Sequence, residues 1–251
     1  MHTRAQRKRQ KLFLAEGHSV IKDAIAHGAR VEELVMSKDY YDSEFDAELF
    51  ENVDKVFILD DKIFAGVATT QTPKGILATV ESFDYSLEEI LEKPNALIAV
   101  AYQISDPGNL GTIIRTSFAF GAAGLLISRG SVDPYNAKVV RSAAGCLFSL
   151  PFVDNLDLNH IIEQARLKQY KTISMVRGED SSIDKVDMRG PTMIILGNEA
   201  HGLPEEILNL TDIKVEIPIA PECESLNLSV AHAICMWEAK KQRTQIDKMS
   251  K

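Results

Sequence analysis

Short apolar runs and helical patterns alternate along the chain. In its first part, the apolar runs predict strands over residues 12–15, 31–36, 56–59 and 75–80. Amphipathic patterns between these runs predict helices over residues 20–27, 44–50 and 60–67. Alternation of strands and helices is typical of α/β proteins. We therefore expect a small, self-contained α/β domain over residues 1–81.

A polar and acidic stretch over residues 82–95 predicts a linker. Beyond it, the alternation predicts strands over residues 96–101, 124–128, 147–153, 170–176, 192–196 and 213–217. Predicted helices cover residues 109–120, 135–144, 158–169, 203–208 and an apolar stretch from residue 230 onward. Asn109 is the expected N-cap of the first of these helices. A second α/β domain would then occupy residues 96–251.

The composition, 45% hydrophobic and 25% charged over 251 residues, is that of an ordinary globular protein. No apolar run approaches the length needed to cross a bilayer, and the start lacks a signal-peptide pattern. The spacing of Cys146, Cys223 and Cys235 fits neither a disulfide framework nor a zinc site. These features favour a reducing compartment, and we expect the cytoplasm.

The net charge of −8 argues against a protein that coats nucleic acid without specificity. Five basic residues nevertheless crowd the first eleven positions with no acidic residue among them: Arg4, Arg7, Lys8, Arg9 and Lys11. Such a cluster suits a tail that binds phosphates, and it equally suits the solvated start of a helix. The sequence leaves both interpretations open.

Two glycine-bearing turns follow predicted strands. The turn at residues 108–111 lacks the full dinucleotide-binding pattern. The turn at residues 197–202 has the outer glycines of a P-loop, but Leu203 and Pro204 stand where lysine and serine or threonine are required. These turns therefore predict close approach of a ligand to the backbone, without the signature of a nucleotide-binding loop.

The stretch over residues 216–229 joins a strand to a helix through a loop with two prolines. One interpretation is an ordinary connection in which Ser225, Asn227 or Ser229 caps the helix. The other is a backbone-lined site at the carboxyl end of a strand, where open α/β sheets bind ligands. No catalytic triad is legible near it, and the histidines and cysteines are better explained as structural residues.

Three stretches in this order resemble the motifs of the SpoU (TrmH-like) RNA ribose methyltransferases of the SPOUT class. They comprise residues 109–116, residues 196–203, and Ile217-Pro218 followed by residues 225–231. The resemblance covers residues 96–240, and the core positions of all three motifs match without gaps. Residues 141–145 are similar to the family's intermediate segment. The first domain is similar to the L30e-like RNA-binding module often fused ahead of this catalytic domain.

The resemblance implies a C-terminal α/β sheet whose end is threaded into a trefoil knot, an exception to the usual rule for chain connections. It implies S-adenosylmethionine as the cofactor, held chiefly by backbone around Gly197, Ile217 and Leu226, and no metal. The neighbouring cofactor positions would be Leu196, Gly202 and Pro218. The family's catalytic motif residues correspond here to Asn109, Arg115, Glu199, Ser225 and Asn227.

The implied reaction moves the cofactor's methyl group to a ribose 2′-hydroxyl, so RNA rather than DNA is the expected substrate. Family members are homodimers, which agrees with the apolar final helix. The family proposal makes Arg115 the general base. Because a guanidinium normally keeps its proton, the alternative is a clamp on the substrate phosphate.

Two further choices concern the function. A separate first domain with a basic start suits ribosomal RNA, most directly 23S rRNA, and transfer RNA is the second candidate. A non-catalytic RNA-binding protein could keep the same fold, although it would not need Arg115, Glu199, Ser225 and Asn227 together. An enzyme acting on a small nucleotide is disfavoured because the phosphate-loop signatures are missing.

Overall fold

The computed structural model describes residues 3–44, 46, 49, 53–178 and 181–249. Their contacts group the chain into two compact units. The first unit combines Met1–Phe83 with Asp133–Ser149, and the second combines Asp84–Val132 with Leu150–Lys251. A later segment of the chain thus belongs to the first unit. The expected domain boundaries after residues 81 and 95 stay predictions.

The first unit is built on a four-stranded sheet in the order β1-β4-β2-β3. Its strands are β1 (Leu12–Glu16), β2 (Val31–Ser37), β3 (Val53–Leu59) and β4 (Ile76–Glu81). Its helices are α1 (Arg4–Gln10), α2 (His18–Ala26), α3 (Lys38–Ser43), α4 (Asp61–Val67) and α7 (Ala137–Ser142). β3 runs parallel to β2, whereas β4 is antiparallel to both of its neighbours. The alternation predicted from the sequence is confirmed for all four strands.

Two sequence predictions in this unit need comment. The helix predicted over residues 44–50 falls largely on positions 45, 47, 48 and 50, which lie outside the described residues. The strand predicted to start at residue 147 is wrong, because Cys146–Phe148 forms a 3-10 turn. Phe148 instead packs on Phe13, with ring centroids 6.3 Å apart. The apolar run there serves the core of the first unit and not a sheet.

The second unit contains a parallel six-stranded sheet in the order β10-β8-β9-β5-β6-β7. Its strands are β5 (Leu97–Ala101), β6 (Gly124–Ser128), β7 (Phe152–Leu156), β8 (Lys171–Met175), β9 (Thr192–Leu196) and β10 (Ile213–Val215). β5, β6 and β9 are buried along their whole length, which explains their continuous apolar runs. In a parallel sheet, all the carboxyl ends meet at one edge.

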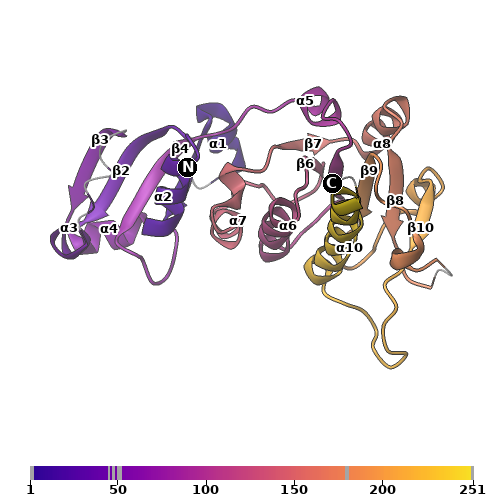
Figure 1. The fold of residues 1–251 in the computed structure, drawn as a ribbon. Helices are drawn as coiled ribbons and strands as arrows, with labels where there is room; N and C mark the ends of the chain where they lie inside the picture. Colours follow the sequence, from indigo (N-terminus) through magenta and orange to yellow (C-terminus); the bar gives the residue numbers. More distant parts are fainter. Residues whose placement is uncertain (1–2, 45, 47–48, 50–52, 179–180, 250–251) are drawn as a thin grey trace. The chain divides into compact units, whose positions relative to one another are not determined.

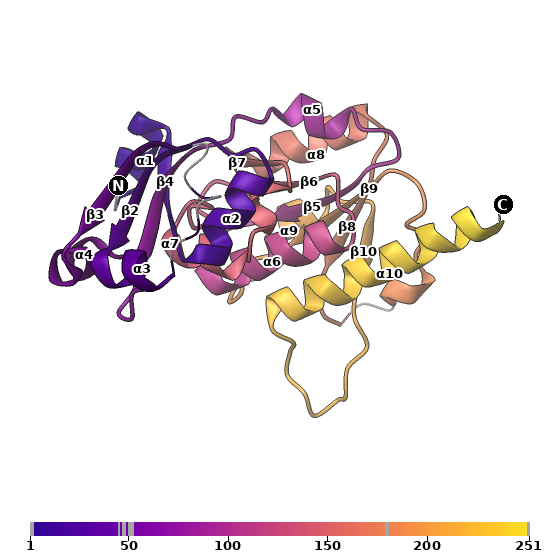
Figure 2. The ribbon, with the colours of Figure 1, turned by 60° about the vertical axis from the view of Figure 1, so that its left-hand side comes forward.

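Helices cover both faces of this sheet (Figure 1). One face packs against α5 (Leu87–Leu91), α8 (Leu158–Leu167) and α9 (Glu205–Leu208). The other face packs against α10 (Leu228–Met249), which lies beside α6 (Pro107–Ala119) (Figure 2). The predicted α/β class is therefore confirmed, and the trefoil knot stays a prediction. Within the described residues, no helix is long and apolar enough to cross a membrane.

Candidate active site

Three loops meet the carboxyl edge of the parallel sheet: residues 102–106 after β5, 197–204 after β9 and 216–227 after β10. β5 and β9 are adjacent, but the chain leaves them in opposite directions. β5 leads through α6 to β6 on one side, and β9 leads through α9 to β10 on the other. Such a reversal of strand order is where open α/β sheets bind ligands.

Glu199 ties the loop after β9 to the loop after β5. One carboxylate oxygen, Oε2, accepts hydrogen bonds from the N–H of Ser105 at 3.0 Å and from its hydroxyl at 2.9 Å. The other, Oε1, accepts from the N–H of Asp106 at 3.1 Å and from Nδ2 of Asn109 at 3.2 Å. Both oxygens are thus already used as acceptors. Glu199 is placed to orient Asn109 and the loop before it.

The protonation state of Glu199 follows from these contacts. Partial burial alone would raise the pKa of its carboxyl group. The hydrogen bonds from Ser105, Asp106 and Asn109 together outweigh burial, and the pKa is lowered below its ordinary value. Glu199 is therefore an anion at neutral pH. Because its lone pairs are engaged by four donors, it is better suited to positioning than to proton abstraction.

Asn109 was predicted as the N-cap of α6, and this prediction is wrong. Asp106 is the N-cap: its side chain accepts from the N–H of Asn109 at 2.9 Å, and Pro107 occupies the first turn. An aspartate followed by proline is the stronger helix start. The Asn109 side chain is consequently available for tertiary contacts. Its Nδ2 donates to Glu199, and its Oδ1 accepts from Asn227 at 3.0 Å.

Asn227 performs two tasks at the start of α10. Its Oδ1 accepts from the N–H of Ser229 at 2.9 Å and from the Ser229 hydroxyl at 2.7 Å, which caps the helix. Its Nδ2 donates to Asn109. The capping interpretation of this stretch is therefore confirmed, and the capping residue also completes a chain of contacts from Glu199 through Asn109. The backbone-lined ligand site stays a prediction.

The turn after β9 brings Leu196, Gly197 and Gly202 together. Asn198 and Gly202 exchange backbone hydrogen bonds of 3.0 and 2.9 Å, which close the turn. A Cβ on Gly197 would lie 2.7 Å from the backbone nitrogen of Leu203, so only glycine fits there. The side chain of Asn198 accepts from the N–H groups of Ala200 and His201 and donates to the carbonyl of Gln103.

The loop after β10 exposes its backbone. It projects from the sheet as an extended segment, drawn in gold at the lower right of Figure 1. Between residues 217 and 226, all of them described, the only backbone–backbone hydrogen bond joins the N–H of Cys223 to the carbonyl of Ala220. Apart from the Ser225 carbonyl, which accepts from the Cys223 thiol, the other N–H and C=O groups that the loop has are available to a ligand. Ile217 and Leu226 are half-buried and Pro218 is exposed, so this chain fits a cofactor held by backbone.

Two predicted residues are not joined to this cluster. Arg115 lies on α6, about 9 Å along the helix axis from Asn109 at 1.5 Å per residue. Its side chain is exposed and makes no hydrogen bond or ion pair within the described residues. Ser225 is also exposed, and its carbonyl accepts a contact from the Cys223 thiol at 3.5 Å. Both remain available to a substrate.

Ser105, Asn198 and Gln103 were not singled out from the sequence. Asn198 lies inside the glycine turn that the sequence did identify, and an asparagine two residues before a backbone donor is a common turn residue. Ser105 shows no comparable pattern, because its importance comes from Glu199, 94 residues further along the chain. Contacts between residues so far apart in the sequence depend on which strands are neighbours in the sheet.

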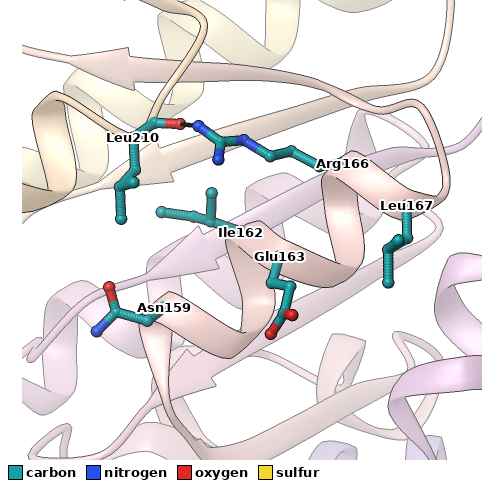
Figure 3. Close-up of a pocket in the computed structure, with 6 residues that line it drawn as sticks. All are labelled: Asn159, Ile162, Glu163, Arg166, Leu167 and Leu210. Carbon is teal, nitrogen blue, oxygen red and sulfur yellow. Dashed lines mark hydrogen bonds between the residues drawn. The ribbon is translucent and has the colours of Figure 1, made fainter.

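The groove in Figure 3 lies elsewhere. It has a volume of about 350 Å³ and runs along the outer side of α8, where Arg166 donates to the carbonyl of Leu210 at 2.8 Å. None of its six lining residues belongs to the contacts described above. Among the residues that the structure describes, no group of three or more histidine, cysteine, aspartate or glutamate side chains could hold a metal ion.

Comparison with known proteins identifies the families that the two parts of the chain match. The SpoU rRNA Methylase family matches residues 96–237, and the MRM3-like substrate binding domain matches residues 1–78. The second match confirms a substrate-binding domain at the start of the chain. A solved structure of the SpoU methyltransferase AviRb from Streptomyces viridochromogenes, in complex with the cofactor AdoMet, superposes with a TM-score of 0.87 at 28% identity, covering 96% of this chain and 94% of that one.

Two curated relatives are similar over nearly the full length. A 23S rRNA (uridine(2479)-2′-O)-methyltransferase of Streptomyces viridochromogenes is 31% identical over 96% of this chain and 86% of its own. The 23S rRNA (guanosine(2553)-2′-O)-methyltransferase RlmP of Bacillus subtilis is 28% identical over 94% and 92%. With the family's match spanning more than half of the sequence, the chain belongs to the SpoU rRNA methylase family.

Proposed function

We propose that the chain is an S-adenosylmethionine-dependent methyltransferase that modifies a ribose 2′-hydroxyl in RNA, most directly in 23S rRNA. The observation that carries the proposal is the chain of contacts from Glu199 through Asn109 to Asn227, because it joins all three family motifs at one edge of the sheet. Relatives named as 23S rRNA 2′-O-methyltransferases match the chain from end to end. Transfer RNA is the second candidate substrate.

The cofactor would be held at the backbone of two loops. The turn at Leu196, Gly197 and Gly202 admits close approach, and the loop from Ile217 and Pro218 to Leu226 offers unpaired N–H and C=O groups. Bound S-adenosylmethionine supplies an electrophilic methyl group. The protein's own task is then to position a weakly acidic hydroxyl and to accept its proton.

Asn109, Glu199, Ser225 and Asn227 would face the ribose. Glu199 fixes the side-chain amide of Asn109, and Asn227 restrains the same amide from the other side. Exposed Arg115 would bind the phosphate of the target nucleotide from α6. Both carboxylate oxygens of Glu199 are already used as hydrogen-bond acceptors, so Glu199 is a positioning residue. The proton of the hydroxyl then passes to solvent beside Arg115, or to an Arg115 side chain that has first released its own proton to solvent.

The first unit would bind a part of the RNA other than the nucleotide that is methylated. Helix α1 buries no residue, and it carries exposed Lys8 and Arg9, which have no partner within the described residues. Arg7 is anchored instead by Asp133, with Nε 2.8 Å from its carboxylate. A helix without an apolar face is stabilised little by packing. Binding of RNA phosphates would explain why α1 carries several basic residues.

A homodimer would cover an apolar stripe on the second unit. Val230, Ile234 and Trp237 follow a helical spacing on α10 and are 48%, 37% and 55% exposed. Phe118 on the neighbouring helix is 42% exposed. Aromatic and aliphatic side chains gathered on one surface mark a protein interface. A cytoplasmic location is part of the same proposal, since the three cysteines are free thiols.

The proposal is tested by incubating the protein with methyl-labelled S-adenosylmethionine and either ribosomal or transfer RNA. We expect label in one nucleotide of the large ribosomal RNA, and none in the same transcript carrying a 2′-deoxy target nucleotide. Label in transfer RNA alone would select the second candidate. Failure to bind the cofactor in calorimetry, together with retained RNA binding, would leave a non-catalytic binding protein.

A further inference from the structure

Gln103 stands out beside the proposed active site because its backbone is left-handed. Its φ is 49°, in a region that glycine enters easily and glutamine rarely. Two side chains hold it there: its N–H donates to the Ser128 hydroxyl at 2.8 Å, and its carbonyl accepts from Nδ2 of Asn198 at 2.7 Å. Backbone held in a costly conformation by its surroundings is concentrated at functional sites.

The side chain of Gln103 is exposed, and its carboxamide makes no hydrogen bond within the part of the chain that the structure describes. Its direction is nevertheless restricted. A Cβ on Gly130 would lie 3.2 Å from Cγ of Gln103, so the glycine leaves room for this stem. The result is an exposed amide beside Gly130, with two donor hydrogens and one acceptor oxygen that no described residue uses.

This amide borders a small polar cavity of about 170 Å³ at the carboxyl ends of β5, β6 and β7. Tyr102, Ser128, Arg129 and Asp157 are among its lining residues. Arg129 approaches Asp157 at 3.5 Å, and the carboxylate disfavours a phosphate at this position. A neutral ligand with both donors and acceptors on one edge suits the cavity better.

The cavity adjoins the Glu199 cluster. Ser105, which donates twice to Glu199, lies two residues beyond Gln103, a separation of roughly 7 Å at most. A nucleotide whose ribose sits at Asn109 therefore has its base within reach of Gln103. Sequence-specific RNA recognition uses unstacked bases whose edges are read by side chains, and an amide can pair with a donor and an acceptor at once.

We propose that Gln103 is a specificity-determining residue that reads the base edge of the nucleotide presented for methylation. This inference rests on the proposed transfer of a methyl group to RNA ribose. Substrate selection would thus be divided: Asn109 and Glu199 locate the ribose, and Gln103 tests the base attached to it. The carboxamide would distinguish bases by the order of donors and acceptors along their edge.

The decisive variant is Gln103→Gly, because glycine suits the left-handed backbone and removes the whole side chain with its amide. The substrates are four transcripts of the methylated ribosomal segment that differ in the target base. We expect kcat/KM for the preferred base to fall about 5- to 150-fold, with smaller losses for the other three, so that selectivity collapses. Cofactor affinity in calorimetry and the melting temperature should stay at wild-type values.

Two companion variants sharpen the test. Gln103→Glu offers acceptors only, so it should shift preference toward a base with two adjacent donors, as guanine has. The matched control is Gln169→Gly, since Gln169 is also exposed and left-handed, with φ 60°, but follows α8. Its selectivity should equal that of the wild type.

The outcomes separate the two proposals. Unchanged selectivity in Gln103→Gly, with an active wild type, overturns the role of Gln103 and leaves the methyltransferase intact. A changed cofactor affinity without changed selectivity overturns it as well, because Gln103 would then serve the cofactor. A wild type that methylates none of the four transcripts, no ribosomal RNA and no transfer RNA overturns both proposals.

Discussion

Asn227 donates a hydrogen bond from Nδ2 to Oδ1 of Asn109 at 3.0 Å, across 118 residues of sequence. The same Asn227 side chain caps α10 through its Oδ1. The helix that covers one face of the parallel sheet therefore begins at a residue of the proposed active site. Stability and catalysis share one side chain, and a suitable substitution can separate them.

Asn227→Asp keeps the acceptor that caps α10 and loses the donor to Asn109. We expect the free energy of unfolding to stay within about 0.5 kcal/mol, since asparagine and aspartate cap equally well. Methyl transfer should fall at least tenfold, because Asn109 loses one of its two restraints. Urea unfolding and single-turnover rates measure the two effects. Unchanged methyl transfer in Asn227→Asp would mean that Asn227 is only a cap.

Substitutions of Arg115 test whether this residue acts as a phosphate clamp or as a general base. For a clamp, Arg115→Lys keeps the positive charge and should retain methyl transfer at about one tenth to one hundredth of the wild-type rate. Arg115→Ala should fall further, by about 100-fold or more. The control is Arg189→Ala, whose arginine pairs with Asp187 at 2.8 Å on the surface. Complete loss in the lysine variant would favour a specific base, and near-normal turnover in the alanine variant would contradict both roles.

Gly197→Ala tests the turn after β9. The added Cβ would meet the backbone of Gly202 and Leu203, so the turn must open, at a cost of about 1–3 kcal/mol. We expect weaker binding of S-adenosylmethionine in calorimetry and a lower melting temperature. Gly190→Ala is the control, because a Cβ there has no atom within 4 Å. Equal cofactor affinity in both variants would remove the turn from the cofactor site.

His232 gives the fold a dependence on pH. It is fully buried between α10 and α6, where its Nε2 contacts the Ser117 hydroxyl at 2.8 Å. Burial lowers the pKa of His232 to about 3, whereas the unfolded value is about 6.5. Between these values only the unfolded state binds the proton, so the free energy of unfolding falls as the pH decreases. At about pH 5 the free energy of unfolding is about 2 kcal/mol lower than at neutral pH.

Urea unfolding at about pH 7.5 and about pH 5 measures this dependence. The difference between the two conditions should shrink in His232→Gln, whatever the variant costs at neutral pH. His160→Gln serves as the control, because His160 is exposed on α8, and it should keep the full difference. If the free energy of unfolding of His232→Gln falls as much on acidification as that of the wild type, another titratable group causes the pH dependence.

Trp237→Glu tests the apolar stripe on α10. A carboxylate in the middle of a buried interface leaves an uncompensated charge, so we expect a monomer in sedimentation velocity at micromolar concentration. The matched control is Leu167→Glu, since Leu167 is 69% exposed on α8 and belongs to the opposite face of the sheet. A dimer that survives Trp237→Glu would exclude this stripe as its interface.

The sequence predicted most of the strands of both sheets, and β5, β6 and β9 most directly, because their apolar runs are uninterrupted. It placed β7 too early in the chain. It also located the three motif stretches. It did not predict the partners of Asn109, because Glu199 and Asn227 lie 90 and 118 residues away and meet it only through the strand order. The wrong cap assignment has a local cause: Asp106 and Pro107 begin the helix three residues earlier.

The grouping of residues 133–149 with the first unit had no sequence pattern to reveal it. Tyr135 lies 4.6 Å from Phe13 between ring centroids, and Arg141 donates to the Thr69 hydroxyl, which in turn contacts buried Glu16. These partners are aromatic, hydroxyl-bearing or charged residues with no regular spacing in the sequence. Their significance appears only when the tertiary contacts are known.

Because residues 133–149 group with the first unit, the protein cannot be divided into its two units by a single cut in the chain. The polypeptide passes between its two units three times, after residues 83, 132 and 149. A fragment ending near residue 81 would lose Tyr135 and Phe148 from the aromatic core around Phe13. A fragment beginning near residue 96 would carry Tyr135 and Phe148 without that core. Exchange of the substrate-binding part between relatives would therefore require two grafted segments, and evolution of a new RNA target would have to alter both together.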